Sequence, residues 1–251
     1  MLLLISFWRI YYTLNFPISK KDFAFFGYRF IIEAVERGTL PRTGPFEKHI
    51  ERYENWFVRN RFAYLSELKA VRVLWNDCSP SLEIGVGSGL FAAPLKIEFG
   101  VEPAYKMAFL ARERGINVIR GIAEALPLKD DLFCQALMVT TICFVDDPLA
   151  SIREAARVLK HRGHLVIGLV DKESPLGRRY EVEKEKSLFY REATFYSTDE
   201  VIRFMKQAGF GNFSFSQAIF SPLEKIFGVE QPISGYGKGS FVVIRGTIGK
   251  S

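Results

Sequence analysis

Three glycines at alternating positions follow an acidic residue in the first half of the chain, in the run Glu83-Ile84-Gly85-Val86-Gly87-Ser88-Gly89. Glycine has no Cβ and adopts positive φ without steric cost, so such a loop lets the backbone approach a ligand closely. An apolar strand candidate precedes the loop, and a helix is expected after it. Ligands of open α/β sheets bind outside the carboxyl ends of strands. The run therefore predicts a ligand site at a strand-to-helix turn.

Two further residues narrow the identity of that ligand. The nicotinamide fingerprint G-x-G-x-x-G requires a third glycine at the position that Leu90 occupies. Glu102 ends the next strand candidate, where an acidic residue hydrogen-bonds ribose hydroxyls in folds of this type. A carboxylate accepts two hydrogen bonds at once, which suits a ribose diol, and it would repel a 2′-phosphate. The pattern therefore argues against NADP.

The E-x-G-x-G-x-G pattern resembles motif I of the class I S-adenosylmethionine-dependent methyltransferases, type 11, and later segments resemble this family in order and spacing. Residues 121–127, Gly-Ile-Ala-Glu-Ala-Leu-Pro, resemble its G-x-A-E-x-L-P segment. Residues 158–163 resemble its R-V-L-K-x-G-G turn. The run V-T-T-I-C-F-V-D-D-P at residues 139–148 is similar to that of uncharacterised thermophile members. The resemblance covers residues 80–170.

This resemblance implies S-adenosyl-L-methionine as the cofactor. It implies cofactor contacts from the glycine loop, the end of the second strand, the segment after the third strand and the end of the fourth. These positions are Glu83, Ile84, Gly85, Val86, Gly87, Gly89, Glu102, Pro103, Ala123, Glu124, Thr140 and Thr141. One departure is Ile122, because many members have an acidic residue there that bonds the adenine amino group. The adenine is therefore expected to contact backbone and apolar groups.

The resemblance also implies the fold class, an α/β protein with a Rossmann-like, seven-stranded, mostly parallel sheet. Helices are expected on both faces, and the last strand is expected to be antiparallel. The short spacing between the glycine loop and Glu102 requires a brief helix, which Pro94 would end. Residues 197–200, Ser-Thr-Asp-Glu, have the pattern of a helix start with an acidic first turn. The remaining candidates are two helices within 46–73, a helix at 148–159 and strands at 134–141, 163–170, 212–219 and 240–245.

The chain is expected to divide into an N-terminal extension, residues 1–45, and a methyltransferase domain, residues 46–251. Residues 22–37 have the apolar spacing of an amphipathic helix. The extension would be sequence upstream of a mispredicted start, an interface helix or a membrane-surface contact. A polar insertion at about 171–198 would follow the fifth strand and lie on the substrate side.

Charge and composition bear on the methyl acceptor. The 251 residues carry a formal net charge of +6, and the sequence pI is about 9.2. The basic residues are scattered among acidic ones, and no interleaving of basic and aromatic residues resembles an RNA-binding module. A small-molecule acceptor is therefore favoured over nucleic acid. An RNA methyltransferase and a non-catalytic S-adenosylmethionine-binding protein are the alternatives.

Three cysteines, Cys78, Cys134 and Cys143, form no C-x-x-C pair, so the sequence predicts no metal site and no disulfide framework. A cytoplasmic location is the expectation that follows from reduced cysteines. The apolar residues 1–16 contain Arg9 and fall short of the roughly 18 apolar residues of a membrane span. They also lack the features of a signal peptide. Assembly into a homodimer is left open.

Methyl transfer from a sulfonium needs alignment and exclusion of water more than it needs side-chain chemistry. No catalytic residue is therefore assigned from the sequence. Aromatic and polar residues at the expected acceptor side are the substrate-binding candidates: Trp56, Asp171, Tyr180 and Tyr190. A general base is needed only for a protonated acceptor, and Asp171 has the best location, although an aspartate after a strand is often a helix cap. The other candidates are Glu173, His161, His164, Tyr180 and Tyr190.

Overall fold

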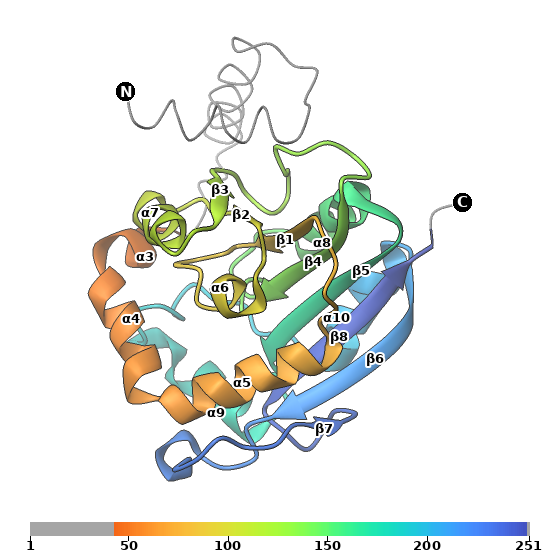
Figure 1. The fold of residues 1–251 in the computed structure, drawn as a ribbon. Coiled ribbons are helices and arrows are strands. Elements are labelled where there is room, and N and C mark those ends of the chain that lie inside the picture. Colours follow the sequence, from red (N-terminus) through yellow and green to blue (C-terminus); the bar gives the residue numbers. More distant parts are fainter. Residues whose placement is uncertain (1–42, 250–251) are drawn as a thin grey trace. The chain divides into compact units, whose positions relative to one another are not determined.

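The computed structural model describes residues 43–249, which lie within one compact unit that spans Pro41–Ser251. This part contains an eight-stranded sheet with the order β3-β2-β1-β4-β5-β8-β6-β7 (Figure 1). Strands β1 to β5 are parallel to one another, whereas β8 is antiparallel to both β5 and β6. The strands are β1 Ser81–Ile84, β2 Phe99–Val101, β3 Asn117–Ile119, β4 Phe133–Val139, β5 Leu159–Val170, β6 Phe210–Ala218, β7 Ile233–Ser234 and β8 Phe241–Ile248.

The predicted fold class is confirmed: the sheet is mostly parallel, and its C-terminal strands are antiparallel. The additional strand is β7, a two-residue strand that pairs antiparallel with β6. A strand this short has no period-2 pattern to read from the sequence. The strand expected at the second position begins later than its apolar run, at Phe99, and Glu102 directly follows its last residue.

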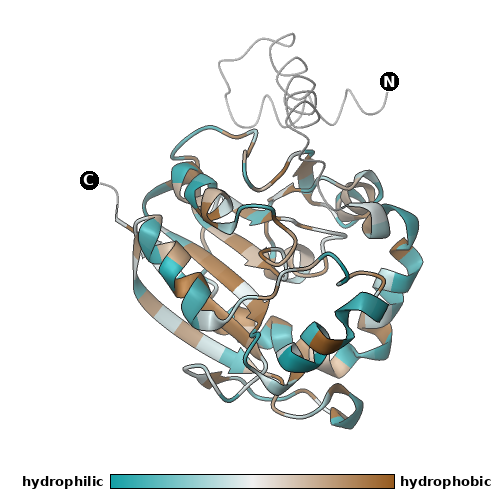
Figure 2. Ribbon diagram, turned by 180° about the vertical axis from the view of Figure 1, so that it is seen from behind, coloured by the Kyte–Doolittle hydropathy of each residue, from teal (hydrophilic) through white to brown (hydrophobic). Residues whose placement is uncertain are grey.

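Helices cover both faces of the sheet. In Figure 1, α5 and α6 lie on the near side of the strands, whereas α8 and α10 lie behind them. Figure 2 shows that apolar residues concentrate in the strands and that hydrophilic residues lie on the outward sides of the helices. The helices are α3 Gly44–Lys48, α4 Ile50–Arg59, α5 Arg61–Leu74, α6 Ala92–Leu95, α7 Tyr105–Glu113, α8 Pro148–Val158, α9 Pro175–Glu183 and α10 Thr198–Gln207.

Local sequence explains where several helices begin and end. Ser197 and Glu200 form a capping box at the start of α10, so the predicted helix start is confirmed. The Asp147 carboxylate accepts a hydrogen bond from the Ala150 amide and caps α8. The predicted brief helix is α6, and it ends at Lys96, which has φ of 57°. Residues 46–73 hold parts of three helices where two were expected.

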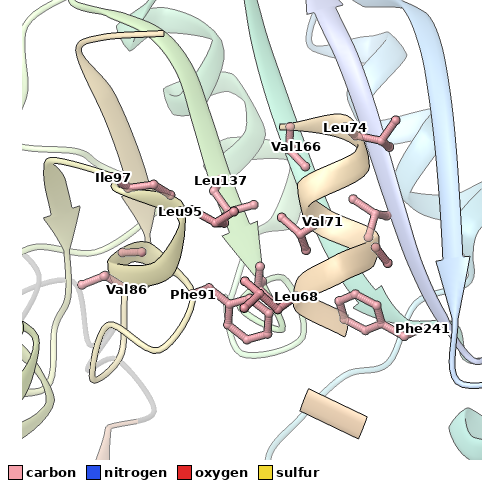
Figure 3. Packing of buried hydrophobic residues seen from close by; sticks show 14 of the residues in the cluster. Leu68, Val71, Leu74, Val86, Phe91, Leu95, Ile97, Leu137, Val166 and Phe241 are labelled. Atoms are coloured by element: carbon pink, nitrogen blue, oxygen red, sulfur yellow. The ribbon is translucent and has the colours of Figure 1, made fainter. Parts of the chain in front are cut away.

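The core beneath the site joins α5 to the sheet. Leu68 and Val71 of α5 face Val166 of β5 and Phe241 of β8 (Figure 3). Burial of one such side chain contributes about 1.5–3 kcal/mol. This packing fixes α5 across the sheet and thereby positions the residues at its N-terminal end.

The expectation for the cysteines was wrong: Cys78 and Cys134 form a disulfide. They are 56 residues apart in sequence, but the pairing of β1 with β4 brings their Cα atoms to 6.3 Å. Spacing along the chain gives no sign of this contact. Cys143 is buried outside the disulfide, and its thiol donates to the Thr140 carbonyl at 3.2 Å.

The N-terminal part of the chain lies almost wholly outside the described residues. The helix predicted at 22–37 and the role of residues 1–42 are therefore not addressed by the structure. Within residues 43–249, no helix is long and apolar enough to cross a membrane.

Candidate cofactor and acceptor site

The glycine loop joins β1 to α6 at the carboxyl edge of the sheet. Its glycines have φ of 70° at Gly85, 55° at Gly87 and 87° at Gly89, a region that other residues rarely adopt. A Cβ on Gly85 would lie 2.4 Å from the Thr141 side chain. The loop therefore requires glycine for its backbone conformation and for its close approach to the end of β4.

Glu102 lies between this loop and the start of α7. Its carboxylate accepts hydrogen bonds from the amides of Gly87 and Ala104, both at 2.8 Å. The side chain is 7% exposed, and burial raises its pKa to about 7, although the two amide hydrogen bonds act against this rise. The structure thus places the predicted ribose-binding carboxylate directly beside the glycine loop.

Glu83, the acidic residue of the motif, has one unpaired oxygen. The residue is 2% exposed, and Oε2 is buried without a hydrogen-bond partner among the described residues. Burial raises its pKa well above the usual range, and the nearby Glu102 adds to this effect. A buried carboxylate is costly unless it is paired, so this end of β1 would be stabilised by a bound cationic group.

Helix α4 covers the glycine loop. The sequence did not predict which residues of this helix contact the loop. The Tyr53 hydroxyl lies 3.3 Å from the position of a Cβ on Gly87. Burial raises the Tyr53 pKa, and the charges of Glu102 and Glu83 raise it further. Glu54 accepts a hydrogen bond from Ser88 and pairs with Arg114. The helical position of Tyr53 in an aromatic-rich segment was visible in the sequence, but its contact with the loop was not.

Other predicted cofactor positions surround the same loop. Thr141 Oγ1 donates to the Gly85 carbonyl at 3.4 Å, and Thr140 has φ of 49°. A positive φ is unusual for a β-branched residue, and such strain often occurs at functional sites. Ala123 is buried. Unlike these residues, Glu124 makes its contact with another loop. Its carboxylate accepts a hydrogen bond from the Asp146 amide at 2.7 Å and so links the two loops.

Aromatic side chains from distant parts of the sequence meet at this edge of the sheet. We define the aromatic cluster as Phe46, Tyr53, Phe144, Tyr180, Phe189, Tyr190 and Phe195. The Tyr180 and Tyr190 rings stack with centroids 5.0 Å apart, and Phe46 lies 5.4 Å from Phe189. Phe144 connects the two groups, since it contacts both Phe46 and Tyr190. The cluster joins α3 and α4 to the segment after β5.

A small cavity of about 10 Å³ lies against the cluster. This volume is close to the lower limit for one water molecule. An organic acceptor would therefore have to displace side chains of the cluster to enter. The cavity is lined by Thr140, Ile142, Cys143, Leu169, Val170, Tyr190, Phe195 and Tyr196.

The predicted acceptor-side residues divide into two groups. Tyr180 and Tyr190 belong to the aromatic cluster, and Tyr190 lines the cavity. Trp56 instead packs against Phe57, with ring centroids 5.0 Å apart. The buried Asp171 carboxylate accepts the amides of Glu173 at 2.8 Å and Thr198 at 3.2 Å. These contacts give Asp171 a structural role in joining the insertion to α10.

The histidine candidates lie away from the carboxyl edge. His161 is exposed near the beginning of β5. His164 Nδ1 lies 3.1 Å from Thr247 Oγ1 of β8. Burial lowers the His164 pKa, and the charge of Arg245 lowers it further. Among the described residues, no group of three or more His, Cys, Asp and Glu side chains forms a metal site.

Comparison with known proteins identifies the family. A family model described as "Methyltransferase domain" matches residues 82–167. An uncharacterized Methanocaldococcus jannaschii protein is 43% identical over 199 residues, which are 79% of this chain and 96% of the relative. A Thermotoga maritima crystal structure is 53% identical and has a TM-score of 0.80, over 82% of this chain and 99% of that one. It is described as a SAM-dependent methyltransferase, possible histamine N-methyltransferase.

A more distant structure shares the fold alone. The putative methyltransferase of Haloferax volcanii, solved with its Trm112 activator, is 16% identical with a TM-score of 0.63. That match covers 82% of this chain and 98% of the other. From the closer relatives and the family model, the chain belongs to the class I S-adenosylmethionine-dependent methyltransferases.

The residues at the glycine loop fit the cofactor of this family. S-Adenosylmethionine carries a sulfonium and an ammonium, and the unpaired Oε2 of Glu83 is a buried acceptor for positive charge. The Glu102 carboxylate is suited to a ribose diol. The protein is an S-adenosylmethionine-dependent methyltransferase.

Proposed function

We propose that the protein transfers a methyl group to a small molecule that enters the aromatic cluster. The observation that supports this proposal is that aromatic side chains of α3 and α4 contact those of the segment after β5. Phe46 of α3 contacts Phe189, and Tyr190 lines a cavity beside Thr140 at the end of β4. An aromatic lining suits a small acceptor, because small-molecule sites are mostly apolar with few polar groups.

We propose the following roles for the cofactor positions. The glycine loop with Ile84 and Val86 would allow close approach of the cofactor, and Glu102 with Pro103 would hold the ribose. Ala123 and Glu124 would lie at the adenine, and Thr140 and Thr141 would lie near the methyl group. S-Adenosylmethionine supplies an activated methyl group. The chain aligns the acceptor with that group and excludes water by means of the aromatic cluster.

We also propose a division of the chain and its cellular location. Residues 46–251 would form the catalytic domain, with 171–198 as an acceptor-side insertion, and residues 1–45 would be an extension. A cytoplasmic location is retained as a proposal despite the Cys78–Cys134 disulfide. Intracellular proteins of hyperthermophiles are an exception to the rarity of cytosolic disulfides. A homodimer is likewise compatible with the proposal.

Labelled S-adenosylmethionine tests the proposed function. The protein is incubated separately with the metabolites of the source cell, with histamine and with total RNA. Label in a small molecule is expected. Histamine is included because the Thermotoga relative is described as a possible histamine N-methyltransferase.

Two other outcomes would contradict the proposal. Label in RNA that is lost when residues 1–45 are deleted would indicate the alternative RNA methyltransferase. Binding of S-adenosylhomocysteine with no transfer to any fraction would indicate a non-catalytic binding protein.

A further inference from the structure

One buried acid at the acceptor side has no role in the cofactor site. Glu67 lies on α5, and its side chain is 6% exposed. It belongs to the helix face that also buries Ala63, Ala70 and Val71. Within residues 43–249, its carboxylate has neither a hydrogen bond nor an ion pair. A glutamate therefore occupies a position on the core-facing side of α5 where an apolar residue would be ordinary.

Tyrosines from three segments are the titratable groups near Glu67. Burial raises the pKa of Tyr180 on α9, of Tyr190 in the following loop and of Tyr64 on α5 itself, and the charge of Glu67 raises each of these pKa values further. Tyr64 donates its hydroxyl to the Leu90 carbonyl at 2.6 Å. Tyr64 and Tyr180 also pack against the core cluster that contains Ala63, Leu68 and Ala70, the α5 residues on either side of Glu67.

The energetic cost of this arrangement indicates a function. A buried carboxylate without a partner is costly, and an apolar residue of similar volume would be more stable. Buried acids of this kind occur preferentially at functional sites. Burial raises the Glu67 pKa to about 8. A ligand that carries a positive charge would supply a partner for its charged form.

The cofactor is not that ligand. Glu83 and Glu102 already lie at the glycine loop, and each has a contact to the backbone there. Tyr180 of the aromatic cluster instead packs against the core cluster to which the α5 residues around Glu67 belong, and a cation is attracted to the faces of aromatic rings.

We propose that Glu67 is the acceptor-binding carboxylate, which pairs with a cationic amine and takes one of its protons before methyl transfer. This rests on the proposed small-molecule function. The ammonium R–NH₃⁺ gives a proton to the Glu67 carboxylate and becomes R–NH₂. The nitrogen lone pair then forms the N–CH₃ bond, while the C–S bond breaks and its electron pair goes to sulfur. The products are the methylated ammonium and S-adenosylhomocysteine, and Glu67 releases its proton to solvent.

Ligand binding tests the charge pairing without turnover. Phenethylamine and its neutral isostere 2-phenylethanol are titrated calorimetrically into protein that is saturated with S-adenosylhomocysteine. The wild type is expected to bind the amine at least ~10-fold more tightly, as for a charge-assisted contact. Glu67→Gln should lose this preference. The matched control Glu51→Gln, which removes an exposed acid on α4, should keep it.

The outcomes separate a binding role from a structural one. Absence of amine binding, equal binding of the two probes, or a preference that survives in Glu67→Gln would overturn the proposal. Glu67→Gln is expected to melt at or above the wild-type temperature at pH 8, since it removes an unpaired buried charge. A lower melting temperature would assign Glu67 to the fold and overturn the acceptor role.

A transfer assay distinguishes this proposal from the proposed function. Labelled S-adenosylmethionine is supplied with equal amounts of phenethylamine, 4-ethylphenol and 3-phenylpropanoate. Label in the amine, with a pH dependence between 6 and 9 that changes in Glu67→Gln, supports the proposal. Label only in the phenol or the carboxylate overturns the role of Glu67 but leaves the small-molecule function intact. Label only in added RNA contradicts both. No label in any of the three compounds overturns the role of Glu67, whereas the assay with cell metabolites decides the small-molecule function.

Discussion

The two edges of the sheet differ in how their polar groups are satisfied. At the amino edge, Cys78 and Cys134 are covalently joined, and Glu98 accepts hydrogen bonds from the Ser81 amide and hydroxyl. Gln135 there donates to the Asn76 carbonyl. At the carboxyl edge, Oε2 of Glu83 is buried without a hydrogen-bond partner among the described residues, and on α5 burial raises the pKa of Glu67 to about 8.

This difference separates stability from function within one sheet. The amino edge gains stability from groups that already have partners. The carboxyl edge carries strained backbone at Thr140 and acids whose charged forms burial disfavours. Such features lower stability, and their partners are expected to arrive with ligands. Variants at the two edges should therefore have opposite effects on unfolding and binding.

The largest effect is expected at the disulfide. Cys78→Ser combined with Cys134→Ser opens a link between residues 56 apart and should lower the free energy of unfolding by about 4 kcal/mol. Thermal unfolding checks the loss, and calorimetry with S-adenosylhomocysteine should show unchanged affinity. Cys143→Ala is the control outside the disulfide. A double variant with wild-type stability would remove the contrast between the edges.

The next effect is a pH dependence of stability from Glu67. Its pKa is about 8 in the folded protein and close to 4.5 when unfolded, so the folded state binds more protons between these values. Stability should therefore fall as pH rises from about 5 to 9, on the order of 3 kcal/mol. Glu67→Gln should flatten this dependence in denaturant titrations at several pH values. An equally steep dependence in the variant would contradict the prediction.

Glu102→Ala is expected to weaken binding of the cofactor product. Loss of a ribose partner should reduce the affinity for S-adenosylhomocysteine by about 1–3 kcal/mol. Calorimetry measures this change, and NADH should show no binding to the wild type. Glu113→Ala removes an exposed acid on α7 and serves as the control. Measurable NADH binding without a response to S-adenosylhomocysteine would refute the cofactor assignment.

The smallest effect is expected from Glu98 at the amino edge. Burial would raise its pKa, but hydrogen bonds from Ser79 and Ser81 lower it below the usual value. A lowered pKa contributes stability above about pH 4.5, and this contribution is lost as pH falls through the folded-state value. Because the side chain is partly exposed, Glu98→Gln should cost less than about 1 kcal/mol at pH 7. A larger loss in chemical denaturation would show that the amino edge depends on this contact.

The position of the glycine loop could be predicted from the sequence, and the family resemblance carried by its motifs implied the fold class. Alternating glycines after Glu83 require no distant partner to be recognised, because their backbone preference is local. Glu102 and the capping box at Ser197 were also readable from short spacings. These features depend on residues that are close together in the sequence, so the order of residues is enough to predict them.

The residues that lie against that loop, and the polar groups that have hydrogen-bond partners, follow only from the packing of distant segments. Tyr53 and Glu67 sit on helices whose aromatic and apolar patterns indicate core packing, and only the docking of α4 and α5 shows which side chains face the site. The position of Asp171 after a strand made it a candidate general base, but in the structure its carboxylate accepts hydrogen bonds from the amides of Glu173 and Thr198. The Cys78–Cys134 disulfide depends on pairing between β1 and β4. The burial of a side chain and its hydrogen-bond partners depend on contacts between distant segments, so the spacing of residues along the chain does not predict them.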